Sequence, residues 1–222
     1  SRGIRGQGQI IGVGDTGVDW DMCFFNELPQ HSDIPLNEID MSRRKIISYN
    51  TVKKTIMGMQ FESDDHDVVD GHGTHVCGSA LGSISNTSEN WQSLHEFDGA
   101  APEAKLYFTD LQGEYFAGLL VPDDLTDYFA GPYHGGARIH SNSWGCNLEA
   151  IFLCSFDCEC VWQFDFDKFK KGQRVSNSWC RDNLGQDCCK FCNMYDTESG
   201  EIDLFMKLHP DFLVIFAGGN DG

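Results

Sequence analysis

Two short motifs in the first third of the chain carry side chains that suit acid–base chemistry. Asp15 follows an apolar run at residues 9–13, and His72 stands between two glycines within residues 71–73. A carboxylate at the end of a buried strand can accept a hydrogen bond from an imidazole and stabilise the imidazolium that forms when the ring takes up a proton. We therefore predict that Asp15 and His72 are hydrogen-bonded, or within about 3.5 Å, in the folded chain.

Both motifs also match patterns of other kinds of site. Gly12, Gly14 and Gly17 fit the G-x-G-x-x-G fingerprint after a strand, which would indicate a nicotinamide-dependent oxidoreductase. Asp15 lies inside that loop, where it would place a negative charge beside the phosphates that the loop's N–H groups bind. His72 also begins an H-x-x-H pair, a pattern too short to establish a metal site. The acid–base interpretation fits both motifs best.

Short and almost continuously apolar runs alternate with candidate helices along the chain, as in parallel sheets covered on both faces. The small residues after His72 suit a helix that starts there and packs closely against a sheet. The other expected elements are strands at residues 9–13, 105–108, 137–140 and 212–217 and helices at residues 123–129 and 199–208. This alternation predicts an α/β fold, a doubly wound and mostly parallel sheet with helices on both faces.

Catalytic and binding groups of such a sheet belong at the carboxyl ends of its strands, where the connecting loops lie. This rule selects Asp15 after the first strand, Ser143 after the third and Asn220 after the fourth.

The charge balance argues against some classes of partner. The chain of 222 residues has 16 Lys and Arg against 34 Asp and Glu, for a formal net charge of −18. Nucleic-acid binders and peripheral membrane proteins need a basic face instead. The apolar runs are too short to span a bilayer. The chain begins in a glycine-rich stretch without Met or a signal peptide, so we expect it to be part of something longer. The oligomeric state stays open.

Cysteine is concentrated in one stretch. Eight of the 10 cysteines lie between Cys146 and Cys192, where no hydrophobic period is sustained. The density favours disulfides and an oxidising compartment, either the extracellular space or the lumen of the secretory pathway. Zinc held by thiolates is the alternative, although the spacings fit no zinc template. We interpret residues 146–192 as a cysteine-rich insertion, and we expect Cys23 and Cys77 to form a disulfide or at least to approach each other.

The acidic segment at residues 62–70 leads directly to His72. Most of its carboxylates are expected to be solvated, but one or more could orient the nearby imidazole or hold a structural calcium ion through oxygen ligands. The spacing does not match an EF-hand loop, so no calcium ligands are assigned. The acid–base chemistry itself requires no cofactor.

The order of these motifs resembles that of the subtilisin-like serine proteases, the subtilases. Four segments carry the resemblance: Asp15 with its flanking glycines, the H-G-T-H of residues 72–75, the S-W-G of residues 143–145 and the A-G-G-N-D-G of residues 217–222. The resemblance implies a subtilisin-like fold and makes residues 1–222 a partial subtilase catalytic domain. Residues 146–192 have no counterpart in the family pattern.

The resemblance implies a role in peptide-bond hydrolysis for each motif. Asp15 orients the base, and His72 takes the proton from the nucleophile and returns it to the leaving amine. The side-chain amide of Asn220 donates to the developing oxyanion, a contribution of about 3–4 kcal/mol in such sites. An extended polypeptide substrate would be bound as an added strand by residues that line the specificity pocket, Ser143, Trp144 and Gly145.

The same roles constrain the sheet and the insertion. Asn220 and the Ser143 segment must reach one substrate carbonyl, so the strands before them should be neighbours, about 4.8 Å apart. The stretch between them must then be a surface excursion, because a buried loop would leave its backbone polar groups unpaired. We expect it to form a flap or wall beside the substrate cleft, tied together by its own cysteines.

One element of the family pattern does not occur in the sequence. The subtilase nucleophile lies in a Gly-Thr-Ser segment after the oxyanion asparagine, and residues 1–222 contain no such segment. We therefore expect a serine endopeptidase whose serine lies beyond residue 222 and whose present chain is inactive alone. The alternative is a non-catalytic pseudoprotease or a protein-binding module of the same fold.

Overall fold

The computed structural model describes residues 3–27, 33–56, 58–84, 95–113, 118–145, 195 and 197–219, and the backbone of residues 153–154 and 160–161. Contacts divide the chain into two units, Ser1–Trp144 with Thr197–Gly222, and Gly145–Asp196. In the second unit, β7 (Leu153–Cys154) pairs antiparallel with β8 (Cys160–Val161). The cysteine side chains from Cys146 to Cys192 lie outside the described residues, so their pairing and the flap remain predictions.

A five-stranded sheet forms the centre of the first unit, with strand order β2-β5-β1-β6-β9. All of its pairs are parallel. The strands are β1 (Ile10–Asp15), β2 (Ile46–Thr51), β5 (Lys105–Asp110), β6 (Ile139–Asn142) and β9 (Leu213–Phe216). The four predicted strands are all present, and the expected neighbours β6 and β9 are paired. The strand β2 was not predicted.

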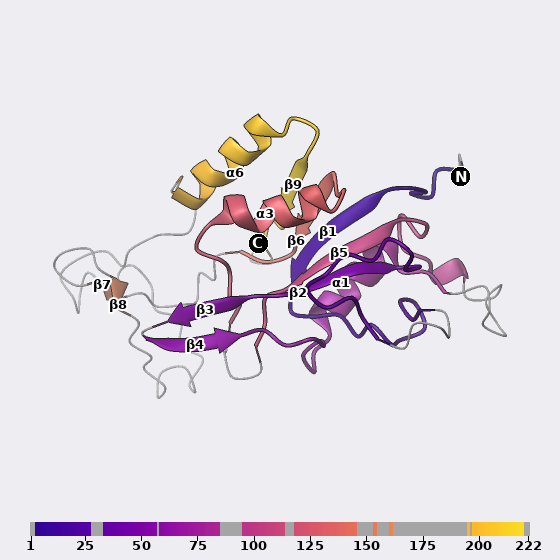
Figure 1. Cartoon of the computed structure of the whole chain (residues 1–222), viewed down its shortest axis with the longest axis horizontal. Coiled ribbons are helices and arrows are strands. Elements are labelled where there is room, and N and C mark those ends of the chain that lie inside the picture. Colours follow the sequence, from indigo (N-terminus) through magenta and orange to yellow (C-terminus); the bar gives the residue numbers. More distant parts are fainter. Residues whose placement is uncertain are drawn as a thin grey trace. The chain divides into compact units, whose positions relative to one another are not determined.

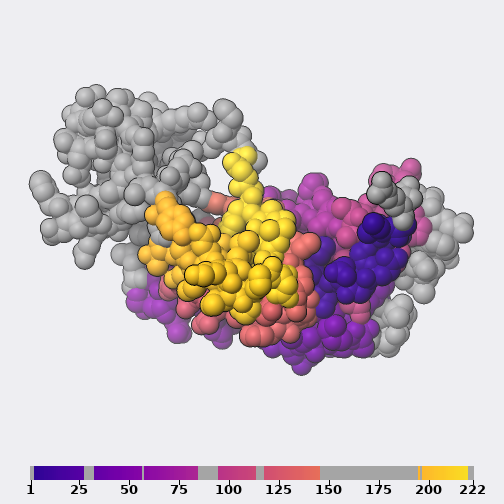
Figure 2. Space-filling view, turned by 90° about the horizontal axis from the view of Figure 1, so that it is seen from above, coloured from indigo at the N-terminus to yellow at the C-terminus, as the bar shows by residue number. Residues whose placement is uncertain are grey.

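Helices cover both faces of this sheet, as the sequence predicted (Figure 1). The helix α1 (His72–Leu81) lies on one face, where Cys77 and Leu81 pack against Val13 and other core residues. The helices α3 (Leu125–His134) and α6 (Thr197–Leu208) lie on the other face and share a second core that includes Phe205 and Phe212. Figure 2 shows the gold and yellow α6–β9 segment lying against the salmon segment that contains α3.

Two further elements lie outside this central arrangement. An antiparallel hairpin of β3 (Lys53–Ile56) and β4 (Met59–Glu62) follows β2 directly. A short 3-10 helix, η1 (His95–Phe97), precedes β5. Neither was predicted, since these segments are charged and largely exposed. None of the described helices is both long and apolar enough to cross a bilayer.

The helix α3 begins and ends differently from the prediction at residues 123–129. Asp124 is its N-cap, and its side chain accepts hydrogen bonds from the N–H groups of Thr126 and Asp127, at 2.8 and 3.1 Å. The helix then continues through the buried Pro132 to His134. Proline removes one helical hydrogen bond, but burial of its ring in the core keeps the segment helical.

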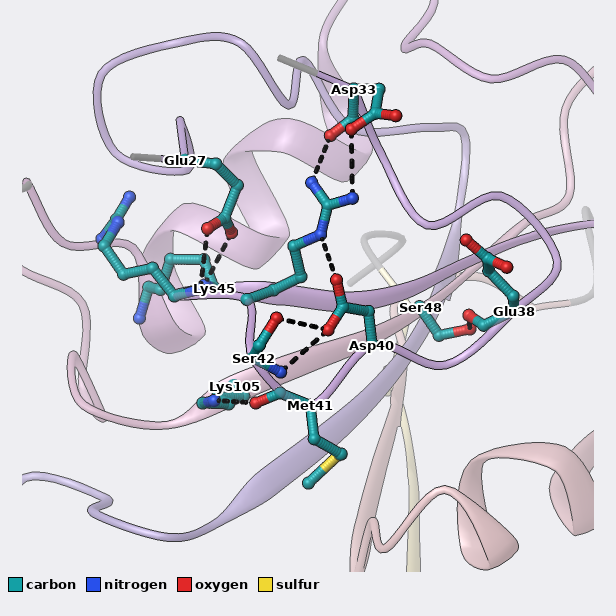
Figure 3. A network of polar contacts seen from close by, with 11 residues as sticks. Glu27, Asp33, Glu38, Asp40, Met41, Ser42, Lys45, Ser48 and Lys105 are labelled. Atoms are coloured by element: carbon teal, nitrogen blue, oxygen red, sulfur yellow. Dashed lines mark hydrogen bonds and ion pairs between the residues drawn. The ribbon is translucent and has the colours of Figure 1, made fainter. Parts of the chain in front are cut away.

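Polar contacts hold the start of β2, and Figure 3 shows one of them, the Glu27 carboxylate beside the backbone of Lys45. The Lys45 side chain is almost fully buried, and its Nζ donates to the carbonyls of Pro102 and Ala104, at 2.8 and 2.9 Å. Burial lowers the pKa of this amine to about 7. Glu27 accepts the backbone N–H groups of Arg44 and Lys45. These contacts fix β2 against the start of β5, a long-range arrangement that local sequence patterns do not reveal.

The structure contradicts the expected bridge between Cys23 and Cys77, because both are free thiols. The helix α1 turns Cys77 toward the sheet, where it is fully buried in the core, whereas Cys23 is exposed on the loop after β1. The two sulfur atoms therefore lie in different environments, although the segments that carry them both follow site residues. Burial also raises the pKa of the Cys77 thiol well above its ordinary value.

We predict that a buried imidazole makes the fold acid-sensitive. His140 is fully buried between α3 and the sheet, and burial lowers its pKa to about 3 from an ordinary value of 6.5. Below pH 6.5 the His140 ring binds a proton in the unfolded chain but not in the folded chain. The contribution of His140 to the free energy of unfolding should therefore fall by about 1.4 kcal/mol for each pH unit. By pH 5 the expected loss from this group is about 2 kcal/mol.

Urea denaturation between pH 7 and pH 4.5 would measure this effect in the chain and in the His140→Phe variant. The variant should lose the part of the pH dependence that His140 contributes. Equal slopes in the wild type and His140→Phe would contradict the assignment.

Candidate active site

Asp15 and His72 form the hydrogen-bonded pair that the sequence predicted. Asp15 is the last residue of β1, and His72 is the first residue of α1. The Asp15 Oδ1 and His72 Nδ1 atoms are 2.6 Å apart. The Asp15 side chain is 1% exposed, whereas that of His72 is 47% exposed. A buried carboxylate therefore holds one nitrogen of an imidazole whose ring remains accessible to solvent.

The environment of the pair favours a charged imidazole. The hydrogen bond that the His72 ring donates to Asp15 raises the pKa of His72 above its ordinary value, and burial only partly opposes this. Burial raises the pKa of Asp15, against the hydrogen bonds that His72 and Thr16 donate to it. Its Oδ2 is buried and has no hydrogen-bond partner among the described residues. Since the imidazole is the more exposed partner, it is the group expected to take up a proton.

The start of α1 is held by two side chains from other segments. Its N-cap residue, Gly71, has φ 66° and no side chain that could cap the helix. The Gly73 N–H donates instead to the Thr16 Oγ1, at 3.0 Å, and the Thr74 N–H donates to the Asp67 Oδ2, at 2.8 Å. Helix N-termini leave such donors unpaired unless an outside group accepts them.

Thr16 and Asp67 are also bonded to each other, since the Thr16 hydroxyl donates to the Asp67 Oδ1 at 2.8 Å. Asp67 is thus one carboxylate of the acidic segment that holds the start of the helix carrying His72. Neither Thr16 nor Asp67 stands out in the sequence as a site residue. A glycine at the expected start of a helix was the available clue, because the first N–H groups then need acceptors from elsewhere.

The glycines of the G-x-G-x-x-G motif bring protein groups together. At each of them a Cβ atom would collide with another part of the protein. It would lie 2.4 Å from the His140 ring at Gly12, 1.7 Å from the Tyr128 hydroxyl at Gly14 and 2.2 Å from the His66 carbonyl at Gly17. A dinucleotide site needs this backbone exposed to the phosphates. The glycines are required here for close packing around Asp15, which argues against the oxidoreductase interpretation.

The segment after β6 lies beside the same strand end. The Trp144 Nε1 donates to the carbonyl of Gly14, the residue before Asp15, at 2.9 Å. The Trp144 ring also packs edge-on against Phe216 of β9, with 5.1 Å between the ring centroids. Ser143 is half-buried and Gly145 is exposed. The fold therefore brings Asp15, His72 and the Ser143–Trp144 segment to one edge of the sheet.

Asn220 lies outside the described residues, which end at Gly219 in this segment. The chain that leads to it leaves the same edge, because the Ala217 N–H donates to the Asn142 carbonyl at 3.0 Å. In the described part of the chain, no group of three or more His, Cys, Asp or Glu side chains is arranged to hold a metal ion.

The arrangement can perform general acid–base chemistry. A carboxylate fixes the tautomer of an imidazole by accepting its Nδ1 proton, and the Nε2 atom can then take a proton from a nucleophile. Backbone groups of the segment after β6 lie nearby and could align a polypeptide as an added strand.

Comparisons with known proteins agree with this geometry. Residues 6–222 match the model of the Subtilase family. The chain is 31% identical over 219 residues to the "Serine protease/ABC transporter B family protein tagD" of Dictyostelium discoideum, covering 98% of the chain and 9% of that protein. It is 36% identical over 176 residues to the "Serine protease/ABC transporter B family protein tagA" of that organism, covering 79% and 9%.

A bacterial protein is also similar. The chain is 31% identical over 115 residues to the "Subtilisin-like protease PopC" of Myxococcus xanthus (strain DK1622), covering 48% of the chain and 17% of that protein. The chain therefore spans only a small part of the curated relatives that it matches, 9% in the Dictyostelium proteins.

Proposed function

The chain belongs to the subtilase family, and from this premise we propose that it forms part of a serine endopeptidase that hydrolyses peptide bonds in polypeptides. The observation that carries the proposal is the 2.6 Å contact between the buried Asp15 carboxylate and the half-exposed His72 imidazole. This contact joins two motifs 57 positions apart in the sequence. It gives the base the geometry that abstraction of a serine proton requires.

In the proposed reaction His72 takes a proton from the serine hydroxyl as the serine attacks the substrate carbonyl. Asp15 stabilises the imidazolium, which then returns the proton to the leaving amine. The Asn220 amide would donate to the oxyanion. We assign the nucleophile to a segment after residue 222, because the family places it there and residues 1–222 lack a Gly-Thr-Ser segment.

The substrate would lie along the segment that follows β6. In the proposal an extended polypeptide pairs with the backbone of this segment as an added strand. The hydrogen bond between Trp144 and the Gly14 carbonyl supports this arrangement, since it places the segment beside the hydrogen-bonded Asp15 and His72. The binding residues would be Ser143, Trp144 and Gly145.

Two further properties belong to the proposal. No cofactor takes part in the acid–base steps, although a structural calcium ion is compatible with the acidic segment before His72. The compartment is the extracellular space or the secretory lumen, for which the density of cysteines between Cys146 and Cys192 is the support.

A second candidate function is a non-catalytic module that binds polypeptides with the same fold. It would use the same substrate-binding segment but would not need the hydrogen bond between Asp15 and His72.

A fluorophosphonate probe, which labels only activated serines, tests the proposal. We expect no labelling of residues 1–222 alone, and labelling of a longer polypeptide that includes the serine segment. The His72→Ala variant of that polypeptide should lose the label. Labelling of a serine within residues 1–222 would contradict the assignment of the nucleophile. A longer polypeptide that folds but never reacts would favour the binding module.

A further inference from the structure

A buried amide links the carboxyl ends of neighbouring strands beside the candidate site. Asn142 is the last residue of β6 and is 1% exposed. Its Nδ2 donates to the Ile215 carbonyl of β9, and its Oδ1 accepts from the Tyr128 hydroxyl of α3, both at 3.1 Å. A buried amide left unpaired would be costly, so these bonds hold the side chain in one orientation.

The Tyr128 hydroxyl also lies against β1. The side chain is 6% exposed, and its oxygen lies so close to Gly14 that a Cβ there would fall 1.7 Å from it. The Trp144 indole holds the Gly14 carbonyl from another direction, at 2.9 Å. Gly14 is thus enclosed by two polar side chains, and the next residue is Asp15. Burial, and after it the Asp15 charge, raises the pKa of Tyr128, so the phenol remains a donor.

These contacts lie on the last shared rung of three strands. Gly14 pairs with Asn142, and Asn142 pairs with Phe216. Beyond this rung β1 continues beside β5, with Asp15 opposite Asp110, and it no longer pairs with β6. Between β1 and β6 backbone pairing ends at this rung, so the side-chain bonds of Asn142 and Trp144 add to the remaining backbone contacts in fixing these strand ends.

We propose that Tyr128 and Asn142 are positioning residues. They fix where the ends of β1, β6 and β9 lie relative to one another along the strand direction, and they thereby place Asp15 and the segment after Phe216. For its effect on catalysis the inference rests on the proposed function; its structural content does not. Tyr128 lies outside the motifs that carry the family resemblance, whereas Asn142 directly precedes one of them. Apolar packing could fill the same space, but only directional bonds would fix these relative positions to fractions of an ångström.

The roles of Tyr128 and Asn142 can be measured separately in residues 1–222. Tyr128→Phe keeps the ring in the core and removes the hydroxyl that braces Gly14. We expect the pKa of His72, followed by NMR of its ring protons, to fall toward that of a free imidazole, because Asp15 is then less well held. Tyr133→Phe is the matched control, since it removes a hydroxyl of the same helix that bonds the distant Asp211 at 3.2 Å.

Asn142→Leu keeps the size of the side chain and removes the link to β9. Amide exchange of Ala217, whose N–H bonds the Asn142 carbonyl, should then accelerate about tenfold, the effect of losing one buried hydrogen bond. In a polypeptide that carries the serine, each variant should lower kcat about 10- to 100-fold with KM within about twofold, as expected for misplacement by about 1 Å.

The outcomes separate the inference from the proposed function. If Tyr128→Phe folds and its His72 titration matches those of the wild type and Tyr133→Phe, the inference is overturned, whatever the activity. If the titration responds to Tyr128→Phe but no peptidase activity is found in any form, the positioning role stands and the proposed function fails. Should Asn142→Leu not fold, Tyr128→Phe still decides the question.

Discussion

Replacing Asp15 by Asn is expected to lower kcat for peptide hydrolysis by about 10⁴-fold in a polypeptide that carries the serine. The Asn side chain is the same size, but its amide can donate to the His72 Nδ1. The imidazole then keeps its proton on Nε2, the atom that must accept the proton from the nucleophile. The pKa of His72 should also fall, because the carboxylate that raises it is gone.

The measurement combines steady-state kinetics with NMR of the His72 ring nitrogens, which reports the tautomer directly. Asp19→Asn is the matched control, since it removes the same charge from an exposed residue on the loop after Asp15. The control should keep both the tautomer and the activity. Full activity of the Asp15→Asn variant would contradict the role of Asp15 in orienting His72.

A single methyl group is expected to have opposite effects at two positions of α1. At Gly73 a Cβ would lie 2.1 Å from the Gly17 carbonyl and 3.1 Å from the Asp15 Cβ. Both neighbours belong to the segment that holds the site, and Gly17 has φ 127°, so the backbone has little room to move. Gly73→Ala should therefore destabilise the fold by at least about 2 kcal/mol and disturb the bond between Asp15 and His72.

At Gly78 of the same helix a Cβ would meet nothing within 4 Å. Gly78→Ala should accordingly stabilise the fold by about 0.5–1 kcal/mol, since alanine loses less conformational entropy in a helix. Urea denaturation of the two variants measures the difference, and the His72 titration shows whether the site is disturbed. A Gly73→Ala variant as stable as the wild type would mean that the contact of α1 with the Gly17 segment is not tight.

The acid sensitivity from His140 and the site chemistry can be measured independently. His140 belongs to the core that packs α3 against the sheet, whereas His72 is half-exposed at the edge of the sheet. Burial lowers the pKa of His140, and a carboxylate raises the pKa of His72. The two pKa values are therefore shifted in opposite directions from the ordinary value of an imidazole. The difference between the stability profiles of the wild type and His140→Phe therefore reports the first group, and a pH profile of activity reports the second.

The sequence alone was sufficient for the α/β class, four of the sheet strands and the pairing of Asp15 with His72. These features follow from local patterns, because nearly continuous apolar runs mark buried parallel strands and catalytic groups gather at their carboxyl ends. The neighbouring positions of β6 and β9 followed from the requirement that two motifs reach one substrate. The strand β2 was missed because its neighbours in sequence are charged, and Lys45 is buried only through carbonyls of a distant segment.

Only the tertiary structure decided how the pair is held. Thr16 and Asp67 meet across 51 positions, and the amide of Asn142 reaches a carbonyl 73 positions away. Such contacts depend on which loops the folded sheet places side by side, and they leave no periodic trace along the chain. The same reason explains why Cys23 and Cys77 are free: two segments can lead away from one site while the helix turns one thiol into the core and the loop turns the other into solvent.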